Sequence, residues 1–173
     1  GHVRVVSARG GKGRKLTDKP GHYLEPVMSP DNLSVVYRKT SGGRLRSGRY
    51  SRDTGIYAKA LRGGEAQRVS RSGSDPHFGA DSKRIFFLRY QDEARVLSSV
   101  DLKGRDVVDH VDSTWATDFY VSPDGRWLAF QERFNVYVTP FPSTGKKRHI
   151  GPKSEALPTA KVSRDAGDFV HWS

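Results

Sequence analysis

The sequence contains no cysteine and only one methionine. A chain without cysteine forms no disulfide, holds no thiolate metal site and offers no cysteine nucleophile, although this absence leaves the redox compartment open. No apolar run approaches the roughly 20 residues that a membrane-spanning helix needs, and helical hydrophobic periodicity is missing over any useful length. We therefore expect no membrane span and a chain built mainly from β-structure.

Motifs of catalysis are also missing. The six histidines include no pair at the His-x-His or His-x-x-x-His spacing of metal ligands. The chain has neither a Gly-x-Ser-x-Gly nucleophile elbow nor a Gly-x-x-x-x-Gly-Lys phosphate loop. We therefore expect no catalytic residue, no metal site and no cofactor in this chain.

What the sequence does contain is a phrase that occurs three times, with starts 50 and 43 residues apart, at Ser29-Pro30-Asp31-Asn32, Gly79-Ala80-Asp81-Ser82 and Ser122-Pro123-Asp124-Gly125. Proline fixes φ, aspartate caps a turn, and asparagine or glycine tolerates positive φ, so the phrase predicts a tight turn. A repeat of about 40–45 residues built from short strands is typical of one blade of a β-propeller.

Each repeat predicts four strands. A first strand ends just before the phrase, at Met28, Phe78 and Val121. The apolar run after the phrase predicts a second strand buried on both faces, at 35–37, 85–87 and 128–130. Alternating residues predict third strands at 56–60, 96–100 and 136–139, and short polar segments predict fourth strands at 67–70, 106–110 and 147–150.

The blades can be delimited along the whole chain. Residues 3–17 align without gaps on 56–70, so residues 1–21 are predicted to be the last two strands of a preceding blade, with Gly1-His2 as the remnant of a cleaved tag. Complete blades are predicted at 22–70, with an inserted basic loop at 41–54, and then at 71–113 and 114–154. Residues 155–173 are predicted to be the first strand of a further, truncated blade. The predicted fold class is all-β: a β-propeller segment of four-stranded antiparallel blades, three complete and partial ones at both ends.

The repeat resembles the TolB/tricorn class of WD40-like (PD40) propeller repeats, and Leu16-Thr17, residues 26–31 and residues 121–125 carry the resemblance. Near the C-terminus, residues 162–167 and 169–173 are similar to the region that joins a tricorn-like propeller to a metal-dependent amidohydrolase domain. This resemblance implies a fragment of a larger bacterial hydrolase, periplasmic or secreted. It supplies no catalytic residue here, because the metal-binding His-x-His of such a domain is missing from the chain.

Acidic residues recur four positions before each phrase, at Glu25, Asp75 and Asp118, with Asp168 displaced by one. First strands line the central channel of a propeller, so these channel-side acids are predicted to form an arc at one mouth, with His77 and Tyr120 on the same strands. One interpretation is a ligand site for a cation or an amine-terminated peptide. The other is structural: each carboxylate accepts backbone N–H bonds and ties neighbouring blades together.

Basic residues outnumber acidic ones, 30 against 19, for a net charge of +11. Their clusters, which include Lys12, Arg44 to Arg52 and Lys146 to Arg148, all fall in predicted hairpin turns or in the inserted loop. Such clusters could neutralise phosphates, but solvated charge is the ordinary state of a loop, and no nucleic-acid motif accompanies them. Trp115, in a predicted loop, fits either packing or recognition.

These features predict a non-catalytic scaffold or interaction module. In a larger amidohydrolase-like protein it would position or gate substrate for its own catalytic domain, which lies outside this chain, or bind another protein. The parent protein is expected to be a metal-dependent amidohydrolase or a peptidase. The alternatives are a TolB-like protein–protein interaction propeller, a peptide- or carbohydrate-binding module and, last, a basic nucleic-acid binder. Open sheet edges also favour a homo-oligomer, in which a second copy completes the propeller.

Overall fold

The computed structural model describes residues 1–42, 51–143, 145–167 and 170–172, and within these ranges it is all-β, with no helix. The predicted fold class is thereby confirmed. The described residues also contain no helix of the length and apolarity needed to cross a membrane. Part of the basic loop (43–50), together with Asp168 and Ser173 from the predicted last strand, lies outside the described residues.

Three sheets repeat the same up-and-down order of antiparallel strands. The first consists of β3 (Gly21–Met28), β4 (Ser34–Gly42), β5 (Gly55–Ala60) and β6 (Gln67–Ser70). The second contains β7 (Ser74–Phe78), β8 (Arg84–Gln91), β9 (Ala94–Asp101) and β10 (Val108–Ser113). The third contains β11 (Ala116–Val121), β12 (Trp127–Glu132), β13 (Asn135–Pro140) and β15 (Ala160–Lys161). Before them, β1 (Arg4–Val5) and β2 (Arg14–Lys15) form a two-stranded hairpin.

One predicted strand pairs elsewhere. The prediction that residues 147–150 form the fourth strand of the third blade is wrong, because β14 (Arg148–His149) pairs in parallel with β10 at the edge of the second sheet. Asp112 on β10 explains this choice: its carboxylate accepts bonds from Lys147 Nζ and His149 Nδ1, both at 2.7 Å. Its carbonyl also accepts the N–H of Ile150 at 2.9 Å. The fourth strand of the third sheet is β15, so this sheet extends beyond residue 154, the predicted end of the third blade.

The repeated phrase folds as a closed hydrogen-bonded turn. In its third copy, Ser122 Oγ donates to Asp124 Oδ1 at 2.5 Å and accepts the N–H of Trp127 at 2.9 Å, while Asp124 Oδ1 accepts the N–H of Arg126 at 3.0 Å. The first copy repeats these contacts at Ser29 and Asp31. The last position of the phrase has positive φ in all three copies: Asn32 57°, Ser82 60° and Gly125 70°. The turn therefore explains why aspartate and a residue with positive φ recur at these positions.

The core lies between the sheets. Phe87 on β8 packs in one cluster with Val36 and Ile56 of the first sheet. Phe86, its neighbour on the opposite face of β8, packs in a second cluster with Phe130 of the third sheet. Residues 35–37, 85–87 and 128–130 are buried, as predicted. For the second sheet the reason is that it lies between the first and third sheets.

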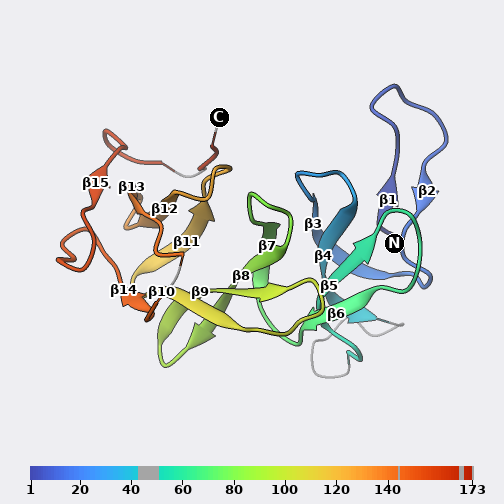
Figure 1. Ribbon diagram of the computed structural model, residues 1–173, viewed down its shortest axis with the longest axis horizontal. Coiled ribbons are helices and arrows are strands. Elements are labelled where there is room, and N and C mark those ends of the chain that lie inside the picture. The colour runs from blue at the N-terminus through green and yellow to red at the C-terminus, as the bar shows by residue number, and fades with distance from the viewer. Residues whose placement is uncertain (43–50, 144, 168–169, 173) are drawn as a thin grey trace.

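The sheets lie side by side in an open row (Figure 1). The β1–β2 hairpin covers the outer face of the first sheet, where Val3 and Leu16 pack with Val35 and Tyr37. The third sheet stands at the other end of the row, away from the hairpin. A closed propeller has about 4–8 blades, and this row describes an arc of such a ring.

Substituting Ser122 should shift the titration of Asp124. The hydrogen bond from Ser122 is the largest of the contacts that lower the pKa of Asp124 to about 2. In the Ser122→Ala variant we expect this pKa to rise towards the ordinary value of about 3.9. Since a lowered pKa adds stability that is lost as pH falls through it, the variant should lose less stability than the parent protein between about pH 4 and pH 2. Carboxyl-carbon NMR titration measures both values.

Arg126→Gln is the matched comparison, because the Arg126 side chain also contacts Asp124, with Nε 2.7 Å from Oδ2, but lowers its pKa less than Ser122 does. A pKa of Asp124 that stays near 2 in Ser122→Ala would contradict this account of the turn.

Candidate functional site

Of the two interpretations of the recurring acids, a ligand site or a structural link between blades, the structural one applies to Glu25. It lies in β3 at a register shift between Leu24 and Val27, with a left-handed φ of 53°. One carboxylate oxygen forms an ion pair with Arg38 of β4. The other accepts the backbone N–H of Asp75 at 2.8 Å, which ties the first sheet to the second. The interpretation that these acids link neighbouring blades therefore holds for Glu25.

Asp75 occupies the equivalent place in β7, with a φ of 52° at the register shift between Ser74 and His77. Its carbonyl accepts a bond from His77 Nδ1 at 3.0 Å, which fixes the imidazole as a donor at that nitrogen. The ring stacks on Phe86 with centroids 5.6 Å apart. Burial lowers the pKa of His77 below its ordinary value, and its Nε2 is enclosed without a hydrogen-bond partner in the described structure.

Asp118 and Tyr120 complete the predicted set on β11. Burial raises the pKa of Tyr120, and the negative charges of Asp118 and Asp75 raise it further, so the second and third sheets bring these three groups near one another. Unlike Glu25, Asp118 receives no side-chain hydrogen bond from any described residue. Trp172 Nε1 donates to the Tyr120 carbonyl at 3.1 Å, which places the end of the chain beside this strand.

The channel-side acids thus divide by role. Glu25 accepts a hydrogen bond that joins two sheets. The carboxylates of Asp75 and Asp118 accept no hydrogen bond from a described residue, and their charges act on Tyr120. Within the described ranges, no three His, Asp or Glu side chains come together as ligands for a metal ion. The arrangement can attract a positively charged group, but it contains no nucleophile–base pair.

The basic clusters do not form one surface. Lys12 and its neighbours belong to the β1–β2 hairpin at one end of the row, and β14 lies near the other end (Figure 1). Lys147 is occupied in the ion pair with Asp112. The cluster from Arg44 to Arg52 lies largely outside the described residues.

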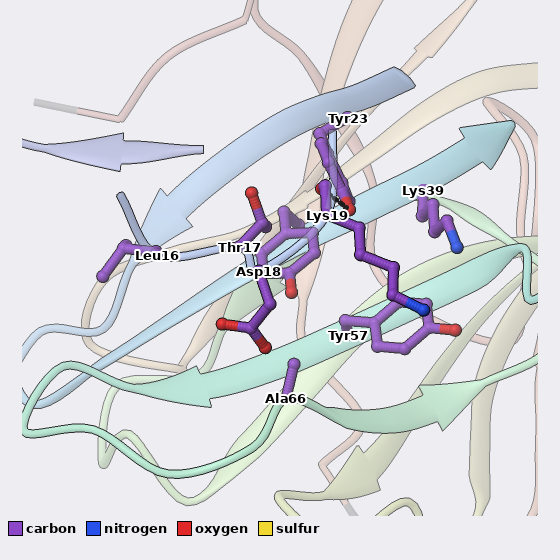
Figure 2. A pocket seen from close by; sticks show the side chains of 9 residues that line it. Leu16, Thr17, Asp18, Lys19, Tyr23, Lys39, Tyr57 and Ala66 are labelled. Carbon is purple, nitrogen blue, oxygen red and sulfur yellow. Dashed lines mark hydrogen bonds between the residues drawn. The ribbon is translucent and has the colours of Figure 1, made fainter. Parts of the chain in front are cut away.

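Sequence reasoning missed a cavity of about 190 Å³ between the β1–β2 hairpin and the first sheet. Figure 2 shows Asp18, Lys19, Lys39 and the rings of Tyr23 and Tyr57 around it. Tyr37 packs edge-on against Tyr23 at 5.4 Å and parallel to Tyr57 at 5.9 Å. Burial raises the pKa of all three hydroxyls. The sequence signal that could have revealed this cavity is the pair of Tyr37 and Tyr57, which occupy paired positions of neighbouring strands.

Fold and repeat together define the chain as a segment of a β-propeller. No protein-family model matches it. It is 30% identical over 129 residues to an uncharacterized peptidase, YuxL of Bacillus subtilis strain 168; this match covers 73% of the chain but only 17% of the peptidase.

Solved structures agree on the fold. TolB of Acinetobacter baumannii matches with a TM-score of 0.61 at 19% identity, covering 82% of this chain and 35% of that one. The β-propeller domain of the trilobed protease of Pyrococcus furiosus matches with a TM-score of 0.55 at 14% identity, covering 83% and 43%. The chain is therefore structurally similar to TolB and to peptidase propellers, and distantly homologous to YuxL. The relationship is to peptidases rather than to the amidohydrolases that the C-terminal residues suggested.

Removing individual acids should separate structural from available carboxylates. Glu25→Ala breaks the ion pair with Arg38 and leaves the Asp75 N–H unpaired, so we expect a loss of about 1–3 kcal/mol in the free energy of unfolding. Asp118→Ala removes no hydrogen bond and should change it by less than about 0.5 kcal/mol. Urea denaturation followed by circular dichroism measures both. Equal losses in the two variants would assign Asp118 a structural role as well.

Proposed function

We propose that this chain is the propeller part of a larger peptidase-like protein, in which it positions or gates peptide substrates for a catalytic domain outside the chain. The observation that carries the proposal is the homology to YuxL, a peptidase of which the chain spans only 17%. The absence of a catalytic motif from the sequence fits this division of labour. Chemistry belongs to the remainder of the protein, and the propeller supplies access and orientation.

The channel-side acids give the proposed gate a chemistry. In a chain of net charge +11, Asp75 and Asp118 place negative charge beside Tyr120 on first strands of two neighbouring sheets. A free peptide amino terminus is positively charged and is attracted to such a site. Peptides would therefore be drawn in amino terminus first, and proteins too large for the channel would be held outside.

The test uses the full-length protein that contains this segment. Its hydrolysis of peptides of increasing length is compared with that of the Asp118→Asn variant, and Asp81→Asn, in an exposed turn, serves as control. For peptides with a free amino terminus we expect KM to rise about tenfold in Asp118→Asn, by the loss of roughly one charge-assisted hydrogen bond, with kcat unchanged. A full-length protein without peptidase activity, or a KM unchanged in Asp118→Asn, would refute the proposal.

A TolB-like interaction propeller is the second candidate, favoured by the TM-score of 0.61 to TolB and by the open ends of the row of sheets. This candidate places a protein rather than a substrate at the channel mouth. It also accommodates a second copy of the chain that covers an open sheet face, which light scattering would record as a dimer.

A further inference from the structure

A second, larger cavity lies at the seam between the second and third sheets. It has a volume of about 600 Å³ and is formed by the β10–β11 connection, the β12–β13 turn and the segment after β14. Six of the residues that line it carry the argument: Trp115, Glu132, Arg133, Asn135, Tyr137 and His149. We call it the seam cavity. All of its walls belong to the described part of this chain, so it does not depend on further blades.

One carboxylate that lines the seam cavity has no hydrogen-bond partner among the described residues. Glu132, the last residue of β12, is only 7% exposed. Within the described ranges its carboxylate accepts no hydrogen bond and forms no ion pair. Burial raises its pKa above the ordinary value, although Arg133 and His149 nearby act in the opposite direction. Its Oε2 faces Gly151, where an added Cβ would lie 3.6 Å away. A carboxylate that faces a cavity without a hydrogen-bond partner is complemented by a positively charged donor, so such a donor suits this site.

The repeat shows that the fold itself does not require an acid here. Lys39 and Arg89 occupy the same position, ten residues after the start of each phrase, in the first and second sheets. Arg89 is fully engaged, with Nη2 2.6 Å from Asp109 Oδ1 and Nε 2.9 Å from Ser98 Oγ. Two of three blades therefore place a cation at this position, and Glu132 reverses the charge at one seam without gaining a partner in the chain.

The rim supplies apolar surface and fixed donors. The guanidinium of Arg133 lies over the Trp115 ring, 5.2 Å from its centroid, and Trp115 remains 62% exposed. Left-handed φ values of 47° at Arg133 and 65° at Phe134 hold this two-residue turn. His149 is anchored through Nδ1 to Asp112 at 2.7 Å, which leaves its Nε2 as a polar group of the rim.

We propose that the seam cavity binds the amino terminus of a short peptide, with the ammonium group at the Glu132 carboxylate and an apolar side chain against Trp115. A cavity of about 600 Å³ lies within the roughly 300–1,000 Å³ of small-ligand sites. The ammonium provides the charge-assisted hydrogen bonds that Glu132 lacks, and the indole provides a flat apolar contact. The choice of a peptide as ligand rests on the proposed function, whereas the requirement for a positively charged group comes from the site itself.

The test compares two probes on the 173-residue chain: Ala-Leu-Ala amide, which carries an ammonium group, and its N-acetylated form, which does not. Titration calorimetry measures affinity, and backbone amide NMR shifts locate the binding. We expect the free-amine peptide to bind at least about tenfold more tightly and to shift the signals of Trp115, Asn135 and Gly151. Equal affinity of the two probes, or no binding of either at millimolar concentration, would overturn the proposal.

Variants assign the binding to the cavity. Glu132→Gln keeps the shape of the side chain and should weaken binding of the free-amine peptide by about tenfold or more, while Glu93→Gln, in the exposed β8–β9 turn, should leave it unchanged. Trp115→Ala, at an exposed position, removes the proposed apolar contact and should also weaken binding of the free-amine peptide. Equal effects of Glu132→Gln and Glu93→Gln would refute the site. Binding that depends on Glu132 in a protein whose full-length form lacks peptidase activity would retain the site and refute the proposed function.

Discussion

The packing of one sheet against the next is the constraint on which the rest of this structure depends. The second strand of each sheet is apolar on both faces, so a sheet standing alone would leave one of those faces in water. Phe87 and Phe86, successive residues of β8, are 1% and 5% exposed only because the first and third sheets cover opposite faces of the second. Burying one such side chain contributes about 1.5–3 kcal/mol. The sequence repeats because every seam has to be filled in the same way.

The same constraint determines where the chain departs from its repeat. After the third blade's hairpin the sequence offers a short polar segment that matches the fourth strands of the other blades. It joins the second sheet instead, because Asp112 binds both Lys147 and His149 there and Ile150 enters the apolar cluster of the adjoining seam. One ion pair, one side-chain hydrogen bond and one buried side chain thus outweigh the pattern of the repeat, and β15 takes the position left open in the third sheet.

In such a fold, a side chain that already bonds from one sheet to the next is not available to bind a ligand, so function falls to the remaining positions. Glu25 is not available, because it joins β3 to β7 through the N–H of Asp75. Asp118 and Glu132 are available, and each introduces negative charge into a strongly basic chain. Asp118 lies on a first strand that lines the predicted channel, whereas Glu132 lies at a seam closed by this chain alone. The two sites proposed for peptides therefore differ in kind: one is shared between blades at the predicted channel, and the other lies between two adjacent sheets.

The sequence by itself determined the all-β class, the three turns and most of the strands, because turn residues and alternation act locally and recur at nearly constant spacing. It also identified Glu25, Asp75 and Asp118 as equivalent positions. Only the tertiary structure decided that Glu25 is structural, that β14 belongs to the second sheet, and that Glu132 lies in a cavity beside Trp115. Each of these depends on which groups meet across a seam. A glutamate in a strand has the same local sequence signal whether its neighbour in space is Arg38, Gly151 or water.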